Sequence, residues 1–158
     1  MENSIIEIVK YKPEHQPWFE KLNRNWIEKF FWMEPLDFEI LQKPEEHIIK
    51  KGGEIFMALY QKEISGTVAL KFVEPGVYEF TKMAVDEKFQ RKKIGEMLAQ
   101  VAIRHAKQQK AKRIFLYSST KLKAAIGLYS KLGFVEIPLD GPYKRSDIKM
   151  ELDFTNSK

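Results

Sequence analysis

The segment with the clearest chemical character is QRKKIG at residues 90–95, which we place at the start of a long helix. The first N–H groups of a helix have no partners inside it, and the helix dipole makes that end positive. Three consecutive cations there would each cost about 0.3–1 kcal/mol unless a bound polyanion offsets the repulsion. Gly95 permits close approach of a ligand to the backbone. The pattern favours an anion-binding site, and a solvated basic turn is the alternative explanation.

Two other segments carry ionisable side chains in an apolar setting. Residues 79–85, EFTKMAV, predict a strand with an acidic residue six positions before a valine. Residues 124–134, AAIGLYSKLGF, predict a helix that ends at Gly133 and leads into another strand. A carboxylate such as Glu79 can accept a proton, and a phenol such as Tyr129 can donate one.

In this order and at this spacing, the three segments resemble the signatures of the GNAT N-acetyltransferase superfamily, and the chain is most similar to its small bacterial-type members. QRKKIG resembles the family's pyrophosphate-binding motif, [Q/R]-x-x-G-x-[G/A]. EFTKMAV resembles its fourth strand, and AAIGLYSKLGF resembles its A-x-x-x-Y-x-K-x-G-F signature. Two positions depart from the family: Lys93 stands at the first motif glycine, and Ser119 stands where many relatives carry asparagine.

The resemblance implies an enzyme with acetyl-CoA as cosubstrate, which acetylates a primary amine by direct attack in a ternary complex. It implies that the N–H of Met83 meets the acetyl carbonyl, that Glu79 is the general base, and that Tyr129 protonates the CoA thiolate. The residues implied to bind the cofactor are Met83, Ala84, Val85, Gln90, Arg91, Lys92, Lys93, Ile94, Gly95, Glu96, Ser119, Lys123 and Tyr129.

Each implied role has a simpler structural alternative. At about 3.3 Å per residue in an extended strand, Glu79 would lie roughly 13 Å from Met83, so water would have to relay the proton. Glu79 would otherwise be a solvent-facing strand glutamate. Tyr129 shares a helical face with apolar residues, as a core tyrosine would. Lys123 suits a surface position as well as a phosphate contact.

The acceptor site is expected between two segments that vary among relatives. Trp26, Phe30 and Phe31 belong to an aromatic helical region, and Tyr143 and Arg145 belong to a late turn. The aromatic residues would otherwise be core, and exposed loop charges usually contribute little. A polyamine, an antibiotic, an amino acid, and a protein N-terminus or lysine all stay open as the acceptor.

The hydrophobic pattern predicts one α/β (α+β) domain over residues 1–158, with its core at about 5–154. We expect a mixed, mostly antiparallel central sheet flanked by helices, in the order β-α-α-β-β-β-α-β-α-β-β. Strands are expected at 5–9, 54–60, 64–73, 77–86, 113–118, 134–139 and 146–154. Helices are expected at 13–34, after a cap at Asp37, from Pro44 to 52–53, at 94–109 and at 122–132, with a frayed tail from Thr155.

The composition excludes several other classes of protein. The 158 residues include 27 basic, 22 acidic and no cysteine residues, which rules out disulfides and thiolate nucleophiles. The three histidines are isolated, so we expect no metal. The N-terminus lacks signal-peptide character and no apolar run approaches about 20 residues, so we expect a cytoplasmic protein with no membrane partner. No aromatic and basic platform supports nucleic-acid binding.

The expected partner is a small-molecule or peptide amine, and edge-strand pairing would allow a homodimer. The alternative is a catalytically inactive CoA-binding sensor or interaction module on the same fold. Lys93 and Ser119 motivate this alternative, whereas the presence of both Glu79 and Tyr129 favours the enzyme.

Overall fold

The computed structural model describes residues 5–155, so the expectations for the first four residues and for the tail beyond Thr155 lie outside the described residues. The strands are β1 (Ile6–Lys10), β2 (Glu54–Tyr60), β3 (Glu63–Glu74), β4 (Val77–Val85), β5 (Arg113–Ser118), β6 (Val135–Ile137) and β7 (Ile148–Asp153). The α-helices are α1 (Gln16–Phe30), α2 (Pro35–Gln42), α3 (Ile94–Gln108) and α4 (Lys123–Lys131). Shorter helical turns are η2 (Pro13–His15), η3 (Glu45–Ile49) and η4 (Glu87–Phe89).

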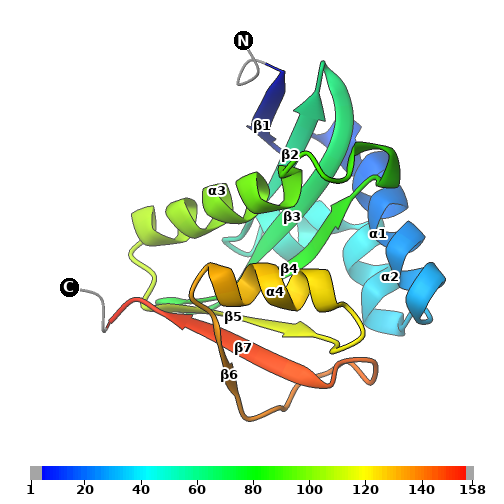
Figure 1. Cartoon of the computed structure of the whole chain (residues 1–158). Coiled ribbons are helices and arrows are strands. Elements are labelled where there is room, and N and C mark those ends of the chain that lie inside the picture. The colour runs from blue at the N-terminus through cyan, green and yellow to red at the C-terminus, as the bar shows by residue number, and fades with distance from the viewer. Residues whose placement is uncertain (1–4, 156–158) are drawn as a thin grey trace.

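All seven strands belong to one sheet, in the order β1-β2-β3-β4-β5-β7-β6 (Figure 1). β2, β3 and β4 form the predicted antiparallel meander. β4 and β5 are parallel, because α3 crosses between them, and this is the kind of connection that a parallel pair needs. The single α/β domain, the mostly antiparallel sheet and the element order confirm the predicted fold class.

Helices cover both faces of the sheet (Figure 1). α3 and α4 pack on one face, where Leu98 and Tyr129 join a core with Phe80 of β4. α1 and α2 pack on the other face, where Phe19 and Leu41 are fully buried. Among the helices between residues 5 and 155, none has the length and apolar character that crossing a bilayer requires.

The position of α3 follows from its sequence pattern. Its buried residues recur at helical spacing and include three alanines, whose short side chains let the helix lie close to the sheet. They are Ile94, Leu98, Ala99, Ala102 and Ala106. This packing fixes the N-terminus of α3 directly after β4, with the basic segment between them.

β4 separates from β5 after the first third of its length. The two strands pair through three residues each, and the pairing ends at Glu79 on β4 and Phe115 on β5. On its other side β4 keeps pairing with β3 as far as Val85. Residues 80–85 of β4 therefore have no neighbouring strand on the β5 side, and the sheet is splayed there.

A β-bulge lies in the part of β4 that has no neighbouring strand on the β5 side. Thr67 and Ala69 of β3 pair with Ala84 and Thr81, so β4 has one residue more than β3 across this interval. Lys82 has a φ of 55°, in the left-handed region that costs a residue with a side chain about 1–2 kcal/mol. Because the bulge shortens the path along β4, the spacing of roughly 13 Å expected for a regular strand between Glu79 and Met83 is an upper limit.

The helical segments before β2 differ from their predicted boundaries. The first helix ends at Phe30, earlier than predicted, and is preceded by the turn η2. Asp37 does not cap α2: it lies in the first turn, where its Oδ2 accepts a hydrogen bond of 2.9 Å from the N–H of Glu34. The third helix after Pro44 is only the five-residue π-helical turn η3.

The last two strands are shorter than predicted, and residues 138–147 form a loop between them. Pro138 and Pro142 lack the N–H that a strand ladder needs, which explains the early end of β6. Gly141 has a φ of 111° and lies so close to the ring of Tyr117 that a Cβ there would clash at 2.5 Å. This loop therefore folds back onto β5 beside the splay.

Candidate active site

One cavity of about 410 Å³, a size typical of small-ligand sites, opens at the splay between β4 and β5. Its lining includes Tyr129 from the α4 face of the sheet and Trp26 from the α1 face, so the cavity passes through the sheet. The residues that line it are Trp26, Phe30, Phe31, Glu79, Phe80, Thr81, Lys82, Met83, Ala84, Val85, Gln90, Tyr117, Ser118, Ser119, Lys121, Leu122, Lys123, Ala124, Ala125, Tyr129, Tyr143, Arg145 and Ser146.

This cavity brings together most of the residues proposed from the sequence. The three proposed for catalysis line it, as do all five proposed for the acceptor. Among those proposed for the cofactor, the lining includes Met83, Ala84, Val85, Gln90, Ser119, Lys123 and Tyr129. Residues 91–96 are not part of the lining and lie at the start of α3.

The segment of residues 91–96 presents a run of free amides. Among residues 5–155 none of these six N–H groups donates to a backbone carbonyl outside the helices and strands, and the first N–H groups of α3 have no partner inside the helix. Arg91 and Lys93 have φ values of 68° and 64°, and such alternating left-handed residues turn successive N–H groups toward one anion-binding concavity. The side chain of Glu96 points elsewhere, because it forms a salt bridge of 3.1 Å with Lys131. The backbone here is built to receive an anion.

Lys93 occupies the left-handed conformation that a glycine adopts without strain. The backbone of Lys93 therefore has the conformation that a glycine would have there, but for a lysine this conformation is strained. Gly95 differs, because a Cβ there would meet Val85 and Met83 only at 3.8 Å and 3.9 Å, which are ordinary contacts. Packing within the chain therefore does not require a glycine at position 95.

Glu79 is buried in the wall of the cavity, with 8% of its surface exposed. The solvent-facing alternative is therefore wrong. Burial raises the pKa of Glu79, against the opposing effect of Lys71, Lys82 and Lys149. A carboxyl group with a raised pKa in a concave site is better matched to proton transfer near neutral pH than an exposed one.

Tyr129 is both a core residue and a cavity residue. Its ring packs edge-to-face on Phe80 and Phe134 at centroid distances of 5.8 Å and 5.9 Å. Burial raises the pKa of Tyr129, so the phenol keeps its proton at neutral pH and can act only as a donor.

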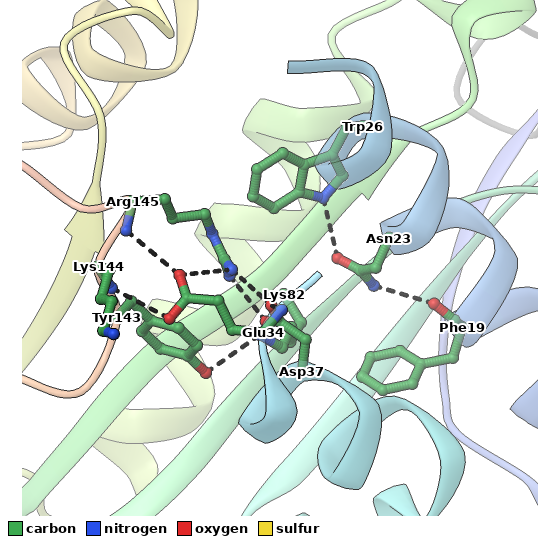
Figure 2. A network of polar contacts seen from close by, with 9 residues as sticks. All are labelled: Phe19, Asn23, Trp26, Glu34, Asp37, Lys82, Tyr143, Lys144 and Arg145. Carbon is green, nitrogen blue, oxygen red and sulfur yellow. Dashed lines mark hydrogen bonds and ion pairs between the residues drawn. The ribbon is translucent and has the colours of Figure 1, made fainter. Parts of the chain in front are cut away.

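A buried ionic network backs the α1 face of the cavity (Figure 2). The Nζ of Lys82 donates to Asp37 Oδ1 at 2.7 Å and to the hydroxyl of Tyr143 at 3.1 Å. Arg145 binds both carboxylate oxygens of Asp37 through Nη1 and Nη2. Burial would raise the pKa of Asp37, but the hydrogen bond from Arg145 and the charge of Lys82 outweigh it and lower the pKa.

Glu34 completes the network and fixes the loop of residues 138–147 to the start of α2. Its carboxylate accepts hydrogen bonds from the N–H groups of Lys144 and Arg145 at 3.1 Å and 3.2 Å. Sequence reasoning missed Lys82, Asp37 and Glu34 as parts of the site. The available signals were a charged residue within an apolar strand and the Glu34-Pro-Leu-Asp37 helix start.

Ser119 and the distribution of acidic and histidine side chains are two further features of the site. Ser119 is buried, and its Oγ accepts a hydrogen bond from the N–H of Lys121 at 3.2 Å, which leaves the O–H free to donate. Within residues 5–155, no three histidine, aspartate or glutamate side chains are grouped so that they could hold a metal ion.

The substitution Asp37→Asn should lower the free energy of unfolding by about 3–5 kcal/mol, because it leaves two buried cations without their shared anion. Asp140→Asn is the matched control: Asp140 pairs with Lys149 at 2.7 Å, but its side chain is 71% exposed. The control should change stability by at most about 1 kcal/mol. Urea unfolding measures both, and equal effects of the two substitutions would contradict the structural role of Asp37.

Lys93→Gly should raise the free energy of unfolding by about 0.5–1 kcal/mol, because it removes left-handed strain of about 1–2 kcal/mol and adds a smaller entropic cost. Lys92→Gly, next to it, should have the opposite sign, because Lys92 is not among the residues with positive φ and its ammonium lies 5.0 Å from the ring of Tyr60. A loss of stability in Lys93→Gly, measured by urea unfolding, would mean that the lysine side chain itself holds the loop.

Comparisons with known proteins agree with this geometry. A sequence profile of the acetyltransferase (GNAT) family matches residues 14–134. The chain is 28% identical over 122 residues to the uncharacterized N-acetyltransferase YobR of Bacillus subtilis. The alignment covers 76% of this chain but 49% of YobR, so the chain spans about half the length of that relative.

Solved structures share the fold. An acetyltransferase of the GNAT family from Staphylococcus aureus Mu50 matches with a TM-score of 0.86 at 22% identity, over 94% of this chain and 98% of its own. The PaiA N-acetyltransferase of Thermoplasma acidophilum, solved in complex with coenzyme A, matches with a TM-score of 0.74 at 19% identity over the same shares. Because the family profile matches well over half of the sequence, this chain belongs to the GNAT family of acetyltransferases.

Proposed function

We propose that this chain transfers the acetyl group of acetyl-CoA to a primary amine by direct attack in a ternary complex. The observation that carries the proposal is the open edge of β4 at residues 80–85, which has no neighbour on the β5 side and leads into the free amides of residues 91–96. A long, extended cosubstrate that carries phosphates could contact both features at once.

The described residues fit acetyl-CoA in two ways. The pantetheine arm is an extended chain with amide groups, and it can pair with the open edge of β4 near Met83 and Val85 as an added strand would. The diphosphate suits the amides of residues 91–96 at the N-terminus of α3, where the helix dipole favours negative charge. PaiA, which shares the fold, was solved with coenzyme A.

When bound, acetyl-CoA supplies a reactive thioester. The N–H of Met83 lies on the open part of β4 and would donate a hydrogen bond to the carbonyl oxygen as negative charge develops there. The bulge at Lys82 sets the direction of this N–H, because it rotates the backbone immediately before Met83.

Glu79 and Tyr129 would move the two protons of the reaction. As the amine nitrogen bonds to the acetyl carbon, Glu79 takes the amine's proton through water. As the carbon–sulfur bond breaks, Tyr129, which is protonated at neutral pH, donates its proton to the departing sulfur. Glu79 then loses its proton to solvent and Tyr129 regains one from solvent, so protons and charges balance over the turnover, and no covalent bond to the enzyme forms.

Thermal unfolding with increasing acetyl-CoA tests the proposal, with wild type and Tyr129→Phe compared. Wild type should be stabilised by about 2.7 kcal/mol at a hundredfold excess over the dissociation constant. Tyr129→Phe should show a similar shift but about 10²–10⁴-fold lower turnover, measured as free thiol in the presence of an amine, because only the leaving-group proton is lost.

ATP and NAD serve as controls for the shift and should leave the melting temperature unchanged. Without a shift at millimolar acetyl-CoA, the proposed function fails. A clear shift in wild type without acetyl transfer to any amine would instead indicate the CoA-binding module that lacks activity.

Glu79→Gln should remove the rise of kcat/KM with pH. In wild type this rise follows loss of the Glu79 proton, and because the pKa is raised, the midpoint should lie above the usual value of about 4.3 for glutamate. Glu136→Gln is the control, since Glu136 is an exposed glutamate on β6. If Glu79→Gln keeps the wild-type pH profile, another group or solvent is the base.

A further inference from the structure

The half of the cavity on the α1 face has a wall rich in aromatic rings, with the guanidinium of Arg145 lying 5.8 Å from the ring centroid of Trp26 and 4.5 Å from that of Tyr143. The rings come from the end of α1, from β5 and from the loop of residues 138–147, and they are Trp26, Phe30, Phe31, Tyr117 and Tyr143. They form two edge-to-face pairs, Trp26 with Phe31 and Tyr117 with Tyr143, each with centroids 6.3 Å apart. Such walls match an apolar, planar group better than a flexible polar chain.

The ring of Trp26 is held in a fixed orientation. Its Nε1 donates at 3.1 Å to the amide oxygen of Asn23, and the Asn23 nitrogen donates at 3.0 Å to the carbonyl of Phe19 (Figure 2). Asn23 is fully buried within α1. A preorganised ring binds a flat ligand without the entropic cost of ordering itself.

The two cations that line this half of the cavity are already neutralised. Arg145 is bound to both oxygens of Asp37 and also to Glu34, and the side chain of Lys82 is 1% exposed against Asp37. A carboxylate on the acceptor would have to displace Asp37 and leave a buried charge without a partner. The network therefore disfavours amino acids as acceptors.

A single carboxylate, Glu79, is available to an incoming cation. It is the only acidic residue among the described residues that line the cavity. Lys121, the remaining lining cation near this half, is exposed and lies 5.2 Å from the ring of Phe31. One carboxylate balances one ammonium group, whereas a polyamine carries several charges that would find no partner here.

We propose that the acceptor is a small primary monoamine carried on an aromatic ring, with the ring packed against Trp26 and Phe31 and the amine directed toward Glu79. This inference rests on the proposed function. The cavity of about 410 Å³ must also admit the acetyl-bearing end of the cosubstrate. The acceptor must therefore be a small molecule that fills only part of this volume.

Four amines at saturating acetyl-CoA, with free thiol as the readout, test the inference on the intact protein. The reference compound is 2-phenylethylamine. Phenylalanine adds a carboxylate to it, and butane-1,4-diamine has a second cation in place of the ring. Butylamine has neither the ring nor a second charged group. The kcat/KM for 2-phenylethylamine should exceed each of the others at least about tenfold, as expected for burial of an aromatic ring.

Two tryptophans on α1 provide a matched pair of variants. Trp26→Leu should reduce the ratio of kcat/KM for 2-phenylethylamine over butylamine by about tenfold, because the ring contact is lost. Trp18→Leu should leave the ratio unchanged, since Trp18 is 46% exposed and is not part of the cavity lining. Equal ratios in both variants would overturn the role given to Trp26.

The outcomes separate this inference from the proposed function. Preferred turnover of butane-1,4-diamine or phenylalanine, or of a short peptide through its amino terminus, overturns the inference and leaves the acetyltransferase standing. Binding of acetyl-CoA without transfer to any of these amines overturns the inference, and the proposed function falls with it only if no other primary amine is acetylated. Preferred turnover of 2-phenylethylamine supports both.

Discussion

Backbone N–H and C=O groups in a sheet need partners, and β4 leaves those on one side without a neighbouring strand beyond Glu79. Because unpaired groups that are buried are costly, this edge must be satisfied by water or by a ligand that can pair with it. The separation of β4 from β5 also creates the cavity, since it opens a passage between the two faces of the sheet. The site thus originates in the topology of the sheet, before any catalytic side chain is considered.

The ionic network around Asp37 holds the wall of the cavity on the α1 face. It joins three segments that are far apart in the chain, namely the start of α2, the bulge in β4 and the loop of residues 138–147 (Figure 2). Lys82 is held in a left-handed conformation while its ammonium is anchored on Asp37, so the ion pair offsets the strain of the bulge. The same contacts pair the guanidinium of Arg145 with carboxylates. The cavity wall that contains Arg145 and Lys82 therefore carries no net charge that an acceptor could neutralise. Fold stability and the proposed acceptor preference therefore depend on the same few side chains.

Local patterns made much of this structure predictable. The order of elements followed from hydrophobic periodicity, and the turn from β4 into α3 followed from a short motif whose chemistry is contained in adjacent residues. The network was not predictable, because Lys82 and Arg145 lie 45 and 108 residues from Asp37 in the sequence, and such residues are usually exposed. The left-handed conformation of Lys82 and the burial of Glu79 likewise depend on tertiary contacts that no local pattern carries.

We propose that the open edge of β4 and the amides of residues 91–96 together bind the cosubstrate. Titration of ¹⁵N-labelled protein with acetyl-CoA, followed by amide chemical shifts, tests it most directly. The account predicts that the largest changes occur at Met83, Val85 and residues 91–96, because their N–H groups gain acceptors on binding. Saturable binding that leaves these amides unchanged and perturbs another surface would contradict it.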